Sequence, residues 1–337
     1  MNNSSAADFV YARISGKLAK AFVGDRANKL FQVNSLQDLW VLLFDAEIPL
    51  VPESLLAKKI ETEAEKRFID DFCNSLALFS KPDPVALQLL RFYDYSNLKK
   101  FNYAVCKNQS ELPPLTNISK FTQIKWHLGK DISVMTAGTP FAWYNKKVEI
   151  QEQQEFEQKL DSQYIGLLWQ AVQKERGELR LAMEKIIGEE IILNNILWAI
   201  RLRVYYNMNE DEIKSHLVWA DADKKNKNDI LALPAIKTLN FATDSINDWN
   251  DWQYADLINP VTDGEIWSID PRWVQKSINL KINKQAMKTF HKFPCSPAVL
   301  VPWFKIKQHE LDCIRTAAEG LRLNIDSEQL KTFACVV

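Results

Sequence analysis

The side chains of this sequence that most readily hold metals or attack substrates are its histidines and cysteines. A local zinc site needs such residues a few positions apart, for instance two cysteines separated by two residues. No such pair exists here, and the odd number of cysteines is typical of reduced thiols. His309 and Cys313 lie one helical turn apart and could form a nucleophilic pair, but a buried cysteine is more commonly a small apolar side chain. The pattern therefore predicts no metal site and no catalytic thiol. The residues concerned are His127, His216, His291, His309, Cys73, Cys106, Cys295, Cys313 and Cys335.

A segment rich in tryptophan and aspartate, residues 242–273, offers a second kind of chemistry. Aromatic platforms beside carboxylates could bind a sugar, and a glycosidase would need two carboxyl groups roughly 5–10 Å apart. The interpretation we favour is an irregular segment in which tryptophans anchor the chain and aspartates form turns and caps. The residues at issue are Trp249, Trp252, Trp267, Trp273, Asp248, Asp251, Asp256 and Asp263.

Nucleotide chemistry is not indicated. Phosphate-binding loops use glycines where the backbone must approach the anion, and "ISGKLAK" at 14–20 holds a lone Gly-Lys without the upstream glycine. The net charge of −1 provides no basic surface for nucleic acid. The sequence thus predicts a protein with no active site and no cofactor of its own.

Composition indicates the elements that position these residues. Nine glycines in 337 residues, with abundant Leu, Ile, Lys, Glu and Ala, favour an all-α fold of long helices. The most apolar helix, near residues 190–201, offers about ten apolar residues, whereas a bilayer crossing needs roughly twenty. No secretory signal is evident at the start of the sequence. We therefore expect no membrane span, and membrane contact only through a partner.

The segment "EIILNNILWAIRLRVYYNMNEDEI" at 190–213 predicts a long helix, then a short one capped by Asn209 with Glu212. One helical stripe is apolar, and a second stripe suggests that both sides of the helix are covered. We expect Arg201 or Arg203 to pair with a carboxylate or a helix-end carbonyl. The alternative is that one of them contacts a binding partner directly. The apolar stripe is Leu193, Ile196, Leu197, Ile200 and Val204, and the second is Asn194, Trp198, Arg201 and Tyr205.

The pattern of this segment recurs near the C-terminus when Ile196 is aligned with Ile314, and more weakly when it is aligned with Leu98. In the later copy Gly320 is expected to end the long helix, and Asp326 with Gln329 to cap the short one. Helix-breaking stretches at 80–84, 110–117, 220–229 and 293–297 separate the copies. These features predict three helical modules, at residues 1–112, 113–228 and 229–337.

Several separated motifs together resemble the C subunit of V-type and archaeal-type ATPases, which is called the d subunit in eukaryotes. The start "YARISGKLAKAF" is similar to that family's first helix, and "KLDSQYIGLL" to its central element. "NNILWAIRLRVYYN" and "WFKIKQHELDCIRTAAEGL" resemble its later helices, with Ile200 in place of the family's leucine. The positions that match the motifs, or lie beside them as candidate partner contacts, are Arg13, Asp161, Tyr164, Asn195, Arg201, Arg203, Glu310 and Arg315.

The resemblance implies a funnel of three pseudo-repeated helical modules. Such a protein sits on the cytoplasmic side of the membrane, on the rotor ring, and receives the central stalk. It would transmit torque between them for ATP-coupled ion transport, as a peripheral component without catalysis. Its partners would be central-stalk and rotor-ring subunits, with no nucleic acid. The alternative is a helical-repeat scaffold that binds a cytosolic protein.

Overall fold

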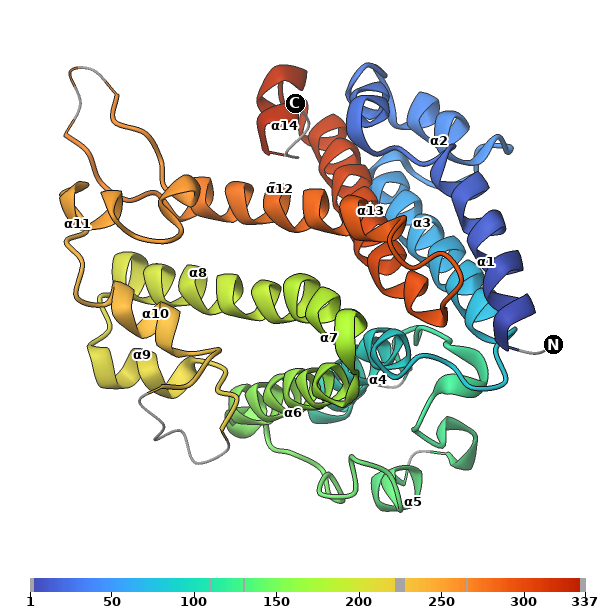
Figure 1. Ribbon diagram of the computed structural model, residues 1–337. Coiled ribbons are helices and arrows are strands. Elements are labelled where there is room, and N and C mark those ends of the chain that lie inside the picture. The colour runs from blue at the N-terminus through green and yellow to red at the C-terminus, as the bar shows by residue number, and fades with distance from the viewer. Residues whose placement is uncertain are drawn as a thin grey trace.

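The computed structural model describes residues 3–109, 111–129, 131–221, 228–262, 264 and 266–333, and every regular element within those ranges is a helix (Figure 1). The predicted all-helical class is confirmed. Within the same ranges, no helix combines the length and the apolar character that a bilayer crossing requires. The α-helices are α1 (Asn3–Leu18), α2 (Leu36–Phe44), α3 (Glu53–Leu76), α4 (Pro84–Cys106), α5 (Ile132–Thr136), α6 (Gln153–Lys174), α7 (Gly177–Met183), α8 (Glu189–Tyr206), α9 (Glu210–His216), α10 (Leu233–Thr238), α11 (Asn247–Asn250), α12 (Pro271–Phe290), α13 (Leu300–Leu323) and α14 (Ser327–Phe333).

Helix starts follow local capping chemistry. The carboxylate of Asp83 accepts a hydrogen bond from the backbone N–H of Ala86. The first residue of α4 is a proline, which has no backbone N–H that would need an acceptor at the start of the helix. Asp270 opens α12 in the same way, and Asn209 with Glu212 forms the predicted capping box of α9. The breaks predicted at 80–84 and 293–297 separate α3 from α4 and α12 from α13. The predicted break at 110–117 follows α4, and its first residue, 110, lies outside the described residues. Most of the break predicted at 220–229 also lies outside them.

The end of α13 differs from its prediction. Gly320 does not end this helix, which continues to Leu323 and stops where Asn324 adopts the left-handed conformation with φ of 53°. Gly320 instead provides space, because a Cβ atom there would lie 2.1 Å from Cδ1 of Leu330 in α14. The predicted cap of α14 holds for Asp326, which accepts from the backbone N–H of Glu328 at 3.0 Å. The side chain of Gln329 lies outside the described residues.

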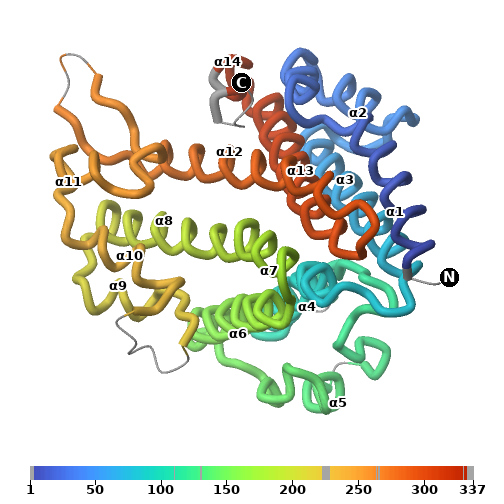
Figure 2. Tube along the Cα trace, in the orientation of Figure 1, coloured from blue at the N-terminus to red at the C-terminus, as the bar shows by residue number. Residues whose placement is uncertain are grey.

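Six long helices form three arms. The helix α3 packs along α13 (arm A), α4 along α6 (arm B), and α8 along α12 (arm C). Figure 2 shows the two helices of arm C running side by side away from arm A. Three of the connections between consecutive long helices lie at the inner ends of the arms. They are the short links α3–α4 and α12–α13, and the connection from α6 to α8 through α7 and a π-helical turn, Glu184–Gly188.

The inner ends of all six long helices share one apolar core, which we call the hub. Its centre is aromatic: Phe72 of α3 stacks on Trp303 of α13 with ring centroids 5.8 Å apart and packs edge-on against Phe304 at 5.0 Å. Gly188 lets α8 approach α6 here, because a Cβ atom would lie 2.9 Å from the Trp169 ring. Close-packed interiors deform little, so the hub holds the three arms in fixed directions.

Each arm also has a core of its own further out. In arm A, α2 and α14 cover the pair of long helices; in arm B, α5 and neighbouring loops do so; in arm C, α9, α10 and the tryptophan-rich segment do so. Each arm pairs two long helices from different thirds of the sequence. The division into modules at 1–112, 113–228 and 229–337, and their arrangement as a funnel, stay predictions.

Candidate functional site: the hub pocket

A polar cavity of about 300 Å³ opens where the three arms leave the hub, and we call it the hub pocket. This volume lies at the lower end of the range for ligand sites. Because the walls come from all three arms, the pocket exists only when the arms are held together. Its main lining residues are Glu65 of α3, Phe92 and Tyr93 of α4, Glu190 of α8, Asn279 and Asn283 of α12, and Lys305, Gln308, His309, Asp312 and Arg315 of α13.

The repeat seen in the sequence reappears in the pocket wall. Phe92, Glu190 and Gln308 each lie six positions before the residues aligned as Leu98, Ile196 and Ile314, and all three line the pocket. One comes from each of the three helices that run outward from the hub. Equivalent positions of the repeat thus face one shared space, although their chemical types differ.

Both cations of the pocket have acidic partners. Lys305, with only 8% of its side chain exposed, contacts a Glu190 oxygen at 2.8 Å and donates to Gln308 at 2.9 Å. Arg315 contacts Asp312 at 2.8 Å. A buried cation without such a partner would be strongly unfavourable, so the carboxylate of Glu190 stabilises Lys305 in this position.

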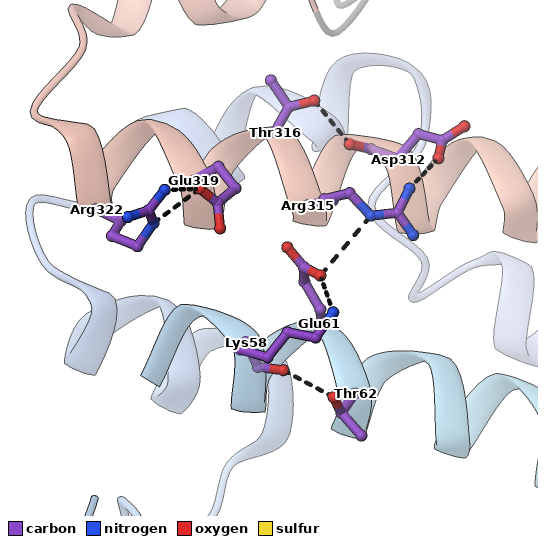
Figure 3. A network of polar contacts seen from close by, with 8 residues as sticks. All are labelled: Lys58, Glu61, Thr62, Asp312, Arg315, Thr316, Glu319 and Arg322. Carbon is purple, nitrogen blue, oxygen red and sulfur yellow. Dashed lines mark hydrogen bonds and ion pairs between the residues drawn. The ribbon is translucent and has the colours of Figure 1, made fainter. Parts of the chain in front are cut away.

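Arg315 also connects the two long helices of arm A. Figure 3 shows its guanidinium reaching across from α13 to Glu61 of α3, at 3.9 Å, while Lys58 approaches the same carboxylate at 3.3 Å. Further out on α13, Arg322 pairs with Glu319 at 2.6 Å. Exposed ion pairs of this kind contribute little to stability, so the apolar cores hold the arm together and the charges give its surface a defined pattern.

The His309 and Cys313 pair has the geometry of a contact but not of a reactive site. Cys313 Sγ lies 3.8 Å from His309 Nε2, and the thiol is buried in the core of arm A. Burial lowers the pKa of His309, so its imidazole is neutral at pH 7. A neutral imidazole next to a buried thiol favours the packing interpretation. Within the described ranges, no group of three or more histidine, cysteine or acidic side chains is placed to hold a metal ion.

Among the predicted site residues, Arg315 lines the pocket and Tyr164 lies beside it. The Tyr164 ring packs edge-on against Phe92 at 5.6 Å, and burial together with the charge of Glu190 raises the pKa of its hydroxyl. Asp161, one turn earlier on α6, pairs with Lys99 of α4 at 2.6 Å and so joins the two helices of arm B. Arg315 and Tyr164 therefore lie at or beside the place where the arms meet, whereas Asp161 lies within arm B.

Two other predicted residues connect the N-terminal segment to the long helices. Arg13 on α1 lies 4.0 Å from Asp71 of α3, which also pairs with Lys17 at 2.5 Å. Glu310 of α13 is buried, accepts from the backbone N–H of Phe22 at 2.7 Å and pairs with Lys307. Both therefore fix the packing of α1 and the chain after it.

The two arginines of α8, Arg201 and Arg203, were expected either to pair with a carboxylate or helix-end carbonyl or to contact a partner. Arg203 donates to the carbonyl of Phe241 at 2.6 Å and to that of Thr238, the last residue of α10, at 3.3 Å, which confirms the predicted helix-end pairing. Arg201 has no hydrogen bond or ion pair to any residue that the structure describes. Its stripe is not covered: Trp198 and Tyr205 are 42% and 54% exposed. The prediction of two covered sides was wrong, since α10 and α12 leave this face of α8 open.

Asn195 has a structural role, and its sequence equivalent Asn97 was missed. The Asn195 amide donates to the carbonyls of Val218 and Leu231 and accepts from the Val218 N–H, at 2.8–2.9 Å. Asn97 makes the same two-way contact with the backbone of Thr116, at 2.7 and 2.8 Å. The signal was present, because Asn97 and Asn195 occupy equivalent positions of the repeat alignment. Each fastens the chain that follows its helix.

The tryptophan-rich segment forms the core of arm C. Trp249 and Trp267 are buried and donate through their indole N–H groups to the carbonyls of Ala242 and Asn259, at 2.7 and 3.0 Å. Asp248 accepts from the backbone of Ala242 at 2.9 Å. Trp252 is buried as well, whereas Trp273 is 39% exposed. The three buried rings offer no face to a sugar, so this geometry favours anchoring over the sugar-site alternative. Asp263 lies outside the described residues.

Comparison with known proteins bears on the whole chain. Residues 10–333 match the family described as ATP synthase (C/AC39) subunit. A protein of Treponema pallidum (strain Nichols), described as an uncharacterized protein, is 27% identical over 315 residues, covering 92% of this chain and 91% of that protein. Because the family match spans nearly the whole sequence, the protein belongs to the ATP synthase (C/AC39) subunit family, that of the C/d subunit of V-type and archaeal-type ATPases.

Proposed function

We propose that this protein is the coupling subunit between the central stalk and the membrane rotor ring of a V/A-type ATPase. In this role it transmits rotation, and the ATP chemistry belongs to other subunits. The observation that carries the proposal is the convergence of six long-helix ends on one aromatic hub, with a pocket where the arms meet. The family supports membership in such a complex.

The fold is suited to bearing torque. Because each arm pairs helices from different thirds of the chain, turning one third against another must shear both an arm interface and the hub. The hub resists shear through close packing, as in the contacts of Phe72 with Trp303 and Phe304. A load applied at the pocket therefore reaches all three arms without a flexible joint between them.

The partners in this proposal are central-stalk subunits, which would seat at the hub pocket, and subunits of the rotor ring. The protein would lie peripherally on the cytoplasmic side of the membrane and contact the bilayer only through the ring. Such interfaces are broad and distribute binding energy over many residues. The open stripe with Trp198 and Tyr205 on α8 supplies aromatic surface of the kind enriched at interfaces.

A helical-repeat scaffold for a cytosolic protein remains the second candidate, and the same stripe is the observation that favours it. The two candidates differ in what they require of the membrane complex. A scaffold would bind its partner in the absence of any rotor ring, whereas a coupling protein links two parts of one machine.

The coupling function is tested in membrane vesicles from cells that lack this protein. We expect ATP-driven ion pumping to be lost while the soluble sector still hydrolyses ATP, and purified wild-type protein to restore pumping. A tagged copy should purify from solubilised membranes with stalk and ring subunits in fixed proportion. Vesicles that pump normally without the protein, or a tagged copy that purifies alone, would contradict coupling.

A further inference from the structure

The charges of the hub pocket do not balance. Once Lys305 has paired with Glu190 and Arg315 with Asp312, the carboxylate of Glu65 remains. Among the residues that the structure describes, Glu65 has no hydrogen-bond or ion-pair partner. Its negative charge nevertheless acts in the pocket, where it adds to burial in raising the pKa of Tyr93. With His309 neutral, the pocket carries one more negative charge than positive.

A second acceptor lies in the same wall. The side-chain oxygen of Asn283 on α12 is buried and receives no hydrogen bond from the described part of the chain. Leaving such a group unsatisfied is costly, and natural sites commonly satisfy it with a ligand or a partner. Because less than 1 Å² of this oxygen is exposed, a donor group in the cavity reaches it only when the amide turns toward the cavity. Glu65 and Asn283 come from arms A and C, so a single donor group bonded to both would bridge two arms.

The third component of the wall is aromatic. Phe92 of α4 is 40% exposed, and its ring is held edge-on by Tyr93 at 5.5 Å and Tyr164 at 5.6 Å. An exposed aromatic face attracts a cation, and a planar guanidinium in particular, because the ring quadrupole is negative above its plane. The pocket wall thus combines a partly exposed aromatic ring with a carboxylate and an amide oxygen that have no partner among the described residues.

This combination determines the class of ligand. An anion is disfavoured, since both cations are already paired and the remaining charge is negative. Arginine carries five N–H donors on a flat, permanently charged group that can bond a carboxylate and lie on a ring at once, whereas lysine offers a compact charge. Resting on the proposed coupling function, we propose that the hub pocket receives an arginine side chain from the end of the central-stalk partner, held by Glu65, Asn283 and Phe92.

The test is the affinity of the full-length protein for purified central-stalk subunits, measured by titration calorimetry. Losing one member of a desolvated charge pair weakens binding by at least about thirty-fold, which is the loss expected for Glu65→Lys, with a smaller loss for Glu65→Gln. The matched control is Glu63→Lys on the same helix, where the wild-type carboxylate pairs with Arg67 outside the pocket. It should change the affinity by less than about two-fold, since rim charges contribute little.

The outcomes separate the two proposals. Wild-type protein that does not bind stalk subunits contradicts the coupling function itself. Wild-type binding that Glu65→Lys and Glu65→Gln leave intact, or that Glu63→Lys weakens equally, overturns the arginine site and leaves coupling standing. Glu65→Gln is the variant that guards against misfolding, because it keeps the shape of the side chain; circular dichroism and thermal unfolding of each variant confirm the fold. A further expected result is a weaker dependence of affinity on salt in Glu65→Gln, since one ion pair is removed.

Discussion

Removing the amide of Asn195 should destabilise arm C by a calculable amount. The side chain is only 4% exposed and makes three hydrogen bonds, two to Val218 and one to the carbonyl of Leu231. In Asn195→Ala these backbone groups lose their partner. A buried group left unsatisfied costs about 1–3 kcal/mol, and the part-exposed groups of Val218 fall at the lower end, so the total is roughly 3 kcal/mol.

The assay is thermal and denaturant unfolding combined with amide hydrogen exchange. For 337 residues the unfolding entropy is about 0.7 kcal/mol/K, so roughly 3 kcal/mol corresponds to a fall of about 4 °C in Tm. Exchange should accelerate most at Val218, whose N–H bonds to the Asn195 oxygen. Asn195→Asp keeps that acceptor but loses both donors, so it should protect Val218 better than Asn195→Ala does, while the carbonyl of Leu231 loses its partner in both variants.

Asn97→Ala is the matched comparison, because it removes only the two bonds to Thr116 and should cost about 2 kcal/mol in arm B. A loss below about 1 kcal/mol for Asn195→Ala, or unchanged exchange at Val218, would refute the idea that this amide fastens the chain after α8.

Three further perturbations test the hub, a buried carboxyl group and the end of arm A. Phe72→Ala should lower the free energy of unfolding by about 3–5 kcal/mol because the ring is fully buried. Leu50→Ala, at a fully exposed position, should change it by less than about 0.5 kcal/mol. Both values come from denaturant melts, and similar values for the two variants would argue against a rigid hub. Burial raises the pKa of Asp94 to about 6 from 3.8, so the folded state holds this proton more tightly than the unfolded state. The stabilisation from that proton is complete below about pH 4 and is lost as the pH rises through 6. The stability of wild type relative to Asp94→Asn should therefore fall by roughly 3 kcal/mol over that interval, and a constant difference across pH would show that the group is not shifted. Gly320→Ala places a Cβ atom 2.1 Å from Leu330, so the backbone amides of α14 should exchange faster, although alanine itself favours the helix α13. Unchanged hydrogen-exchange protection of α14 would mean that Leu330 moves aside freely.

The elements most securely predictable from the sequence were those governed by neighbouring residues. The capping box of Asn209 and Glu212 needs groups only three positions apart, and the apolar stripe of the helix at 190–206 follows from helical periodicity. The end of α13 was less secure, since glycine and asparagine both adopt the left-handed conformation. Packing against Leu330 gave Gly320 a different role, and the helix ended at Asn324.

The candidate site could be predicted only in part. Arg315 was identified through its motif, but Glu65, Phe92 and Glu190 were not, because they belong to three different helices and share no local pattern. The relation of Phe92 to Glu190 becomes visible when the repeat alignment is applied to the structure, whereas Glu65 lies outside that alignment. The exposure of Trp198 was also beyond local reasoning, since which face of α8 is covered depends on where α10 and α12 pack.

The sequence by itself determined that the chain is helical, where several of its long helices start or stop, and which family it belongs to. Periodicity and capping are properties of residues within a few positions of one another, and the family motifs occur in order along the chain. Only the tertiary structure decided that each arm pairs long helices from different thirds of the sequence. It also decided that their inner ends enclose a pocket in which Glu65 has no ion-pair partner among the described residues. Pairing and enclosure depend on contacts between residues far apart in the chain, where the free energy of packing, and not local preference, selects the partner.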